Sequence, residues 1–119
     1  MVSGSRPQLA ALQVWNVVAQ MNTSIIRNAI ANKEVIEFTY QGYPRVAEPH
    51  VYGIKAGKRK ILVYQIGGLA SSGKIPDWRL VNIDEISGLR VIKDQKFAGP
   101  REYHEANYKD WDTIIASAK

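Results

Sequence analysis

The chain has 119 residues and no cysteine. This length is enough for one domain with its own hydrophobic core, and the lack of cysteine excludes disulfides, thiolate zinc sites and thiol nucleophiles. Sixteen Lys and Arg residues against eleven Asp and Glu residues give a net charge of +5, which favours polyanionic partners without indicating a fold. No apolar run approaches the roughly 20 residues of a membrane span, and the N-terminal residues do not resemble a secretion signal, so we expect a cytoplasmic protein without membrane contact.

Two short helices are expected before residue 33. Between residues 8 and 21, apolar side chains recur at helical spacing and form one stripe, which consists of Ala11, Val14, Trp15, Val18 and Met21. The polar segment 22–24 is expected to interrupt the helix, because Ser24 can cap the N-terminus of a second helix over residues 25–32. Four residues of this helix are a candidate contact between copies of the chain, since tryptophan is enriched at protein interfaces: Ala11, Val14, Trp15 and Val18.

Beyond residue 33 the apolar period changes from about 3.6 to 2, which is typical of strands. Five strands are expected, over residues 34–40, 45–52, 60–66, 78–82 and 88–92. Pro49 cannot donate a backbone hydrogen bond, so the second strand should lie at a sheet edge or bend at this residue. Residues 67–77 contain three glycines, two serines and a proline, and form the long irregular connection.

A short helix is expected at the C-terminus, because Trp111, Ile114, Ile115 and Ala118 fall at helical spacing. The expected fold is therefore mainly β: a small five-stranded β-barrel with one or two N-terminal helices and a short C-terminal helix. Its parts are an N-terminal tail and helix over residues 1–24, the barrel domain over 25–97, and a C-terminal extension with a short helix over 98–119.

Motifs for catalysis and metal binding are missing or fail in their context. Residues 68–74 have the Gly-x-x-x-x-Gly-Lys spacing of a phosphate-binding loop, but Ile75 follows and the segment leads into a strand, so there is neither a hydroxyl for magnesium nor a helix N-terminus. His50 and His104 show no metal-site spacing. Glu48 and His50 share one strand face, where their side chains can touch, but no serine completes a triad. We expect no catalytic residues, no cofactor and no metal.

Aromatic and basic residues alternate on neighbouring expected strands. Flat rings for stacking and guanidinium groups for phosphate are what a nucleotide or a single-stranded nucleic acid requires. A lysine in the glycine-rich connection adds a cation that can contact an anion. The candidate ligand-binding residues are Arg45, His50, Tyr52, Tyr64, Lys74, Trp78 and Arg79. The alternative is that the aromatic residues fill the core with their hydroxyls at the rim, while the arginines lie on a solvated surface.

Several short motifs together resemble the WYL domain of bacteria. They are Ile25-x-x-x-Ala29-Ile30-x-x-Lys33-x-Val35-Ile36-x-Phe38-x-Tyr40, Arg45-x-x-x-Pro49, Ile61-Leu62-Val63 and Arg79-x-Val81-x-Ile83-Asp84-x-Ile86. The order and spacing of these motifs carry the resemblance over residues 25–97. The stretch 67–79 is similar to the short stand-alone versions of the domain, which are largely uncharacterised.

The resemblance implies an Sm-like (Src-homology-3-like) barrel and a regulatory domain that senses a ligand, often nucleic acid or a nucleotide. Arg45 and Arg79 stand at the positions of basic residues that face the ligand in the family. The chain departs from the family at the Trp-Tyr-Leu triplet, which aligns with residues 60–62 (Lys-Ile-Leu). It also departs at Glu85, where the family has a basic residue, and at Val81, where the family has phenylalanine.

Two hypotheses about function follow. The first is a non-enzymatic, regulatory ligand-binding module of WYL type that binds a nucleotide or single-stranded nucleic acid through its arginines and tyrosines. The second is a structural or protein-interaction module without a small ligand, in which the N-terminal helix joins copies of the chain into a homo-oligomer.

Overall fold

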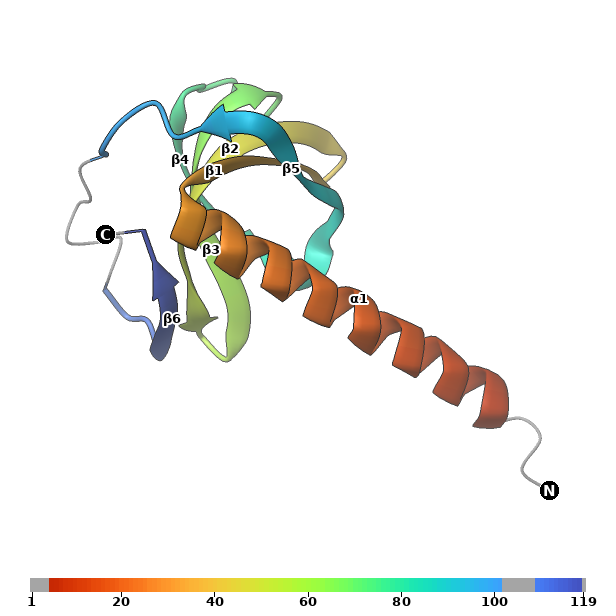
Figure 1. Cartoon of the computed structure of the whole chain (residues 1–119). Helices are drawn as coiled ribbons and strands as arrows, with labels where there is room; N and C mark the ends of the chain where they lie inside the picture. The colour runs from red at the N-terminus through yellow and green to blue at the C-terminus, as the bar shows by residue number, and fades with distance from the viewer. Residues whose placement is uncertain (1–4, 102–108, 119) are drawn as a thin grey trace.

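The computed structural model describes residues 5–101 and 109–118, and the side chains from residue 17 onward (Figure 1). Its elements follow one another along the chain in a simple order, a helix and then strands. They are α1 (Ser5–Asn32), β1 (Glu34–Tyr40), β2 (Tyr43–Lys55), β3 (Lys58–Gly68), β4 (Asp77–Asn82), the 3-10 turn η1 (Ile83–Glu85), β5 (Ile86–Lys96) and β6 (Thr113–Ser117). Within the described residues, no helix is long and apolar enough to cross a membrane.

The N-terminal region is one continuous helix, so the expected interruption at residues 22–24 is wrong. The hydroxyl of Thr23 donates to the carbonyl of Gln20 at 2.9 Å, which satisfies this side chain inside the helix instead of ending it. Ser24 therefore lies within α1 and does not cap a second helix. The helix ends at Asn32, and Lys33 follows in the left-handed conformation (φ 54°), a common way for a helix to stop.

The sheet is built around β2. Its strands are antiparallel in the order β4-β3-β2-β1-β5, and β6 pairs with β2 beside this path. β1 pairs with the first part of β2, as far as Ala47, and β6 pairs with the last part, from Val51. Between the two, the register of β2 against β3 shifts after Pro49, at the predicted bend.

The expected five-stranded barrel needs two corrections. The sheet has six strands, and it is not closed: in the described part of the chain, β4 pairs only with β3 and β5 pairs only with β1. Register shifts in β1–β5 and β2–β3 pairing curve the sheet, because a bulge bends a strand and increases its twist. The result is a strongly curved open sheet with free edges at β4 and β5.

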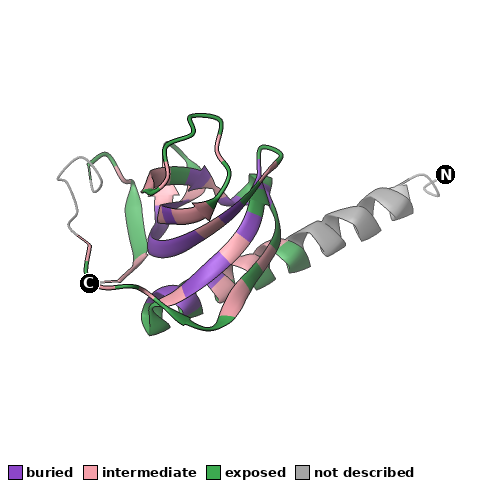
Figure 2. Ribbon diagram, turned by 90° about the horizontal axis from the view of Figure 1, so that it is seen from above, coloured by how far each residue is buried: buried purple, intermediate pink, exposed green. Residues whose placement is uncertain are grey.

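The C-terminal half of α1 packs against one face of this sheet, which we call the inner face (Figure 2). Ile26, Ala29 and Ile30 of the helix are buried there. The sheet residues of the same cluster are Ile36, Phe38, Tyr40, Ala47, Tyr52, Ile61, Val63, Val81, Ile83 and Ile86. In β1 and β3 these residues follow the period-2 pattern of the sequence, whereas in β2 the register shift after Pro49 brings both Ala47 and Tyr52 to this face. We call the opposite face of the sheet the outer face.

The C-terminal segment forms a strand where a helix was expected. β6 pairs with β2 from Val51 to Ile54, and the amide of Asp112 donates to the carbonyl of Ile54 at 2.8 Å. Two physical reasons favour the strand: Thr113, Ile114 and Ile115 are β-branched, and the edge of β2 beyond β1 offers unpaired backbone groups. In the described residues 109–118 there is no helix, and residues 107 and 108 of the expected one lie outside the described part.

Candidate anion-binding site

Arg45 is a buried cation on the inner face. It lies opposite Phe38 of β1, so its side chain points to the same face as the core, and only 5% of its surface is exposed. Its Nη1 donates to Oε1 of Gln65 at 3.2 Å, and its Nη2 donates to the carbonyl of Tyr40 at 3.4 Å. These two hydrogen bonds hold the guanidinium beside the turn that joins β1 and β2.

Two aromatic rings flank this guanidinium. The Cζ atom of Arg45 lies 5.2 Å from the ring centroid of Tyr40 and 5.9 Å from that of Tyr43, distances at which a cation is attracted to the ring face. The hydroxyl of Tyr40 accepts a hydrogen bond from the amide of Asn82 at 3.3 Å, which fixes the ring. Neutral groups and rings therefore position Arg45, and none of them neutralises its charge.

Arg79 brings a second positive charge to the same face. It lies opposite the core residue Val63 in the β3–β4 register, and one of its Nη atoms donates to the carbonyl of Lys74. Burial first, and the nearby charge of Arg79 second, lower the pKa of the Arg45 guanidinium. The phenol groups of Tyr40 and Tyr43 act in the opposite direction with smaller effects. Arg45 and Arg79 therefore lie close enough to repel each other.

Both arginines keep an unused donor. The Nε atoms of Arg45 and Arg79 are buried and have no hydrogen-bond acceptor, and no carboxylate within residues 17–101 or 109–118 forms an ion pair with either side chain. A buried N–H without a partner costs about 1–3 kcal/mol, so two of them at one place require an explanation. An anion bound between the guanidinium groups would satisfy the donors and remove the repulsion.

A second group of predicted residues lies on the outer face. In the strand register, Glu48 of β2 faces Tyr64 of β3, and Tyr64 faces Trp78 of β4. The rings of Tyr64 and Trp78 meet edge to face at a centroid distance of 5.1 Å, and those of His50 and Trp78 do so at 5.0 Å. The guanidinium of Arg101 lies 4.3 Å from the Tyr64 ring. These residues form an aromatic cluster on the side of the sheet away from α1.

Glu48 is fully buried beneath this cluster. Its carboxylate accepts two hydrogen bonds from Arg101, at 2.9 and 3.0 Å, and one from the amide of Ala98 at 3.0 Å. Its contact with His50, predicted from the strand spacing, is confirmed at 3.3 Å. Burial alone would raise the pKa of the Glu48 carboxyl, but these donors outweigh it and hold that pKa below its ordinary value. Burial lowers the pKa of His50, and its hydrogen bond to the Glu48 carboxylate opposes this only in part.

The seven predicted ligand-binding residues therefore do not converge on one place. Arg45 and Arg79 share the inner face, and Lys74 contributes its carbonyl there while its side chain is exposed. Tyr52 is 5% exposed and belongs to the core. The remaining three, His50, Tyr64 and Trp78, lie on the outer face. In the described ranges, no three His, Asp or Glu side chains are grouped to hold a metal ion, and His104 lies outside those ranges.

Sequence reasoning missed two contributors to the arginine site and one to the outer cluster. Gln65 shares the parity of the core residues Ile61 and Val63, and a buried polar side chain in such a strand is a signal for a polar partner. Tyr43 lies between the first two expected strands, where no strand period indicates the direction of its side chain. Arg101 reaches Glu48 from a segment 53 residues later in the sequence, a contact that no local pattern indicates.

Comparisons with known proteins add a likeness of fold. No protein-family model and no curated protein sequence matches the chain. Among solved structures, proteasome accessory factor B/C (PafBC) of Arthrobacter aurescens is similar, with a TM-score of 0.56 and 18% sequence identity. The match covers 73% of this chain and only 14% of the PafBC chain. At this identity the likeness shows a shared fold and says nothing about shared site residues.

Proposed function

We propose that the chain is a non-enzymatic, regulatory ligand-binding module of WYL type, and that Arg45 and Arg79 bind a phosphate group of a nucleotide or of single-stranded nucleic acid. The observation that carries the proposal is the pair of inner-face arginines with buried, unused Nε donors and no carboxylate partner in the described part of the chain. The fold supports it, because PafBC is a transcriptional regulator that contains WYL domains.

Phosphate suits this pair better than a single carboxylate does. A guanidinium presents its Nε–H and one Nη–H as a fork that matches two phosphate oxygens, and two guanidinium groups together match a group with several oxygens. Tyr43 lies beside Arg45 and is only partly buried, so its ring is available for stacking with a base. The net charge of +5 would attract a polyanion to the site.

Fluorescence anisotropy with a labelled oligothymidylate, at low and at moderate salt, tests this function. Arg45→Gln and Arg79→Gln should each weaken binding by about tenfold or more, because each removes a charge-assisted hydrogen bond to phosphate. Arg45→Lys should weaken binding too, because lysine keeps the charge but lacks the fork.

Arg27→Gln is the matched control, because Arg27 is exposed on α1 and does not line the hollow beside Arg45. It should change binding no more than the loss of one general surface charge does. Circular dichroism melting of each variant shows whether the fold is intact. If folded Arg45→Gln and Arg79→Gln proteins bind the oligonucleotide as well as Arg27→Gln does, the two arginines are not the site.

A second candidate function is self-association through α1. Val17, Val18 and Met21 are 53%, 45% and 57% exposed, although they are large apolar side chains on a helix. Ala11, Val14 and Trp15 of the expected stripe lie outside the part whose side chains are described. The exposed residues favour a partner helix from a second copy of the chain.

A further inference from the structure

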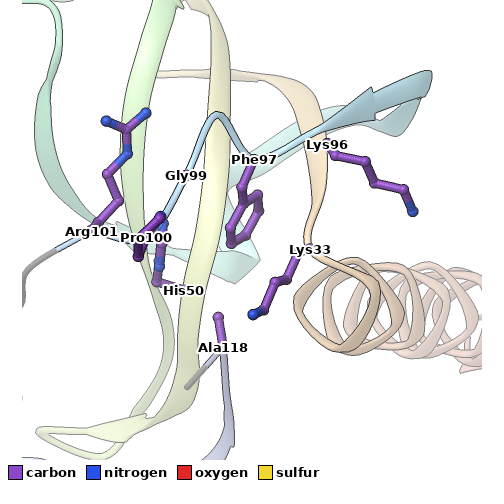
Figure 3. Close-up of a pocket in the computed structure, with 8 residues that line it drawn as sticks. All are labelled: Lys33, His50, Lys96, Phe97, Gly99, Pro100, Arg101 and Ala118. Carbon is purple, nitrogen blue, oxygen red and sulfur yellow. The ribbon is translucent and has the colours of Figure 1, made fainter.

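A separate cavity of about 800 Å³ lies beside an edge of the sheet, where the end of α1, the segment after β5 and the end of β6 come together (Figure 3). The lining residues that matter here are Lys33, His50, Phe97, Pro100, Arg101 and Ala118. Arg45 and Arg79 do not line it. Its volume falls within the roughly 300–1,000 Å³ of small-molecule sites.

Hydrogen bonds to β2 and α1 hold the walls of this cavity in place. The amide of Ala118 donates to the carbonyl of His50 at 2.8 Å, and the amide of Phe97 donates to the carbonyl of Lys33 at 2.9 Å. The amide of Ala98 donates to the buried Glu48 carboxylate at 3.0 Å. The cavity occupies the stretch of the β2 edge between the end of β1 and the start of β6, so it follows from the sheet topology.

Part of the cavity lining is formed by a ring and by apolar side chains. The ring of Phe97 lies 4.6 Å from that of His50 between centroids, at an interplanar angle of 32°. Pro100 and Ala118 complete this surface. Figure 3 shows the Phe97 ring between the Lys33 side chain and His50. A planar hydrophobic body can therefore pack against Phe97 within the cavity.

The charges around the cavity leave one cation unmatched. Arg101 is neutralised by its two hydrogen bonds to Glu48, and Lys96, which also lines the cavity, pairs with Glu34 at 3.9 Å. Burial lowers the pKa of His50, so this ring is uncharged near neutral pH. The ammonium of Lys33 has no carboxylate partner in the described ranges, and Figure 3 shows it extending toward Ala118.

We propose that this cavity binds a small organic monoanion with a planar apolar body, such as an aromatic carboxylate, whose carboxylate pairs with Lys33 and whose ring packs on Phe97. A monoanion supplies one negative charge for the ammonium of Lys33, and the apolar surface of Phe97, Pro100 and Ala118 suits a ring. The site is independent of the arginine pair, so it adds a second ligand to the proposed phosphate ligand.

The test uses 2-naphthoate as the anionic probe and 2-naphthylmethanol as its neutral counterpart, titrated into the full ¹⁵N-labelled chain and followed by NMR. Naphthoate should shift the amide signals of Lys33, Phe97, Gly99 and Ala118. Lys33→Gln should raise the Kd for naphthoate about fivefold or more and leave the Kd for naphthylmethanol unchanged, because only the anion uses the ammonium. Phe97→Leu should weaken both probes.

Lys93→Gln is the matched control, since Lys93 is an exposed lysine of β5 that does not line the cavity. Its Kd for naphthoate should equal that of the wild type, and so should that of Arg45→Gln. Lys33→Gln should in turn leave oligonucleotide binding nearly unchanged, so failure of this site and failure of the arginine site are distinguishable. Shifts confined to residues 17–21 of α1, or an unchanged Kd in Lys33→Gln, would overturn the proposal.

Discussion

At the scale of single residues, Glu48 is the buried charge on which the outer face depends. Its carboxylate accepts hydrogen bonds from His50 of β2 and, in the segment after β5, from the amide of Ala98 and the side chain of Arg101. Each of these contacts favours the ionised form, which is why the pKa stays low in spite of full burial. The carboxylate therefore ties residues 97–101 to the middle of the sheet.

Removing this carboxylate should destabilise the protein strongly. Glu48→Ala should lower the free energy of unfolding by about 2–4 kcal/mol, because it leaves Arg101 and the Ala98 amide without an acceptor. The Arg101 side chain is 26% exposed and can recover some hydration, which favours the lower end of this range. Urea denaturation measures the difference.

The control for Glu48 is Glu37→Ala. Glu37 pairs with Arg90, whose side chain is 76% exposed, so this surface pair should contribute less than about 1 kcal/mol. A loss in Glu48→Ala no larger than that in Glu37→Ala would contradict a structural role of the buried carboxylate.

His50 should make stability depend on pH. Burial lowers its pKa in the folded state, so between about pH 6.5, the unfolded value, and its folded pKa the unfolded chain binds more protons. Stability should therefore fall as the pH drops through this window. Glu48 adds a further loss below about pH 4.3, because its folded pKa is also depressed.

An NMR titration of the imidazole signals measures the first effect directly, with His50→Gln identifying the His50 signal. The midpoint for His50 should lie below about 6.5. Urea denaturation of His50→Gln should show a flatter dependence on pH in the same window. A His50 midpoint above that value would refute the assignment of a buried, neutral ring.

At the scale of elements, β2 is able to hold β6 because of Gly53. A Cβ atom at this position would overlap the carbonyl oxygen of Thr113 and lie 3.0 Å from Cε3 of Trp111. Gly53→Ala should therefore displace β6, lower the free energy of unfolding by about 1–3 kcal/mol and speed amide exchange at Asp112 and Ala118. Hydrogen-exchange NMR detects the local loss.

Gly67→Ala is the control for this effect, because a Cβ at Gly67 meets Val46 at an ordinary 3.5 Å. Exchange at Asp112 and Ala118 should stay slow in that variant. If both variants leave these amides equally protected, the close approach of the chains at Gly53 is not what allows β6 to pair with β2.

The elements that the sequence predicts well are those with a local signal. The alternation of β1 to β5 locates all five strands. The errors come from non-local effects. The C-terminal segment has helical spacing but becomes a strand because β2 offers a free edge, and Arg101 finds Glu48 only in the folded chain.

Two other predictions, the closed barrel and the interrupted N-terminal helix, were wrong because the sequence pattern alone does not decide them. Whether a curved sheet closes depends on how its end strands, β4 and β5, meet, and no residue pattern in either strand encodes that distance. The hydroxyl of Thr23 donates to a carbonyl within α1, and the helix continues. The polar residues 22–24 could equally have ended a helix, so the sequence does not decide between the two.

At the scale of the whole molecule, the fold is elongated because α1 extends well past the sheet (Figure 1). Its principal extents are 57 × 28 × 28 Å. Only two residues of this helix are charged, Arg6 and Arg27, so few charges oppose the burial of its apolar side chains. A helix of this kind with Val17, Val18 and Met21 exposed gains stability when it pairs with a second apolar helix.

We expect copies of the chain to associate through this part of α1. Light scattering coupled to size-exclusion chromatography should then give twice the 13.3 kDa mass of one chain at high concentration. Val18→Glu or Met21→Glu should shift the equilibrium to the monomer, because either buries an unpaired charge at the contact.

Gln95→Glu separates this effect from that of added negative charge. Gln95 is exposed in β5, and the neighbouring Lys96 donates to the carbonyl of Asn32, so the same charge lies at the far end of α1 from Val17, Val18 and Met21. Its mass should match that of the wild type at every concentration. A wild-type mass that stays at one chain across the concentration range would refute the helix contact, and the exposed apolar residues would then need a different protein to cover them.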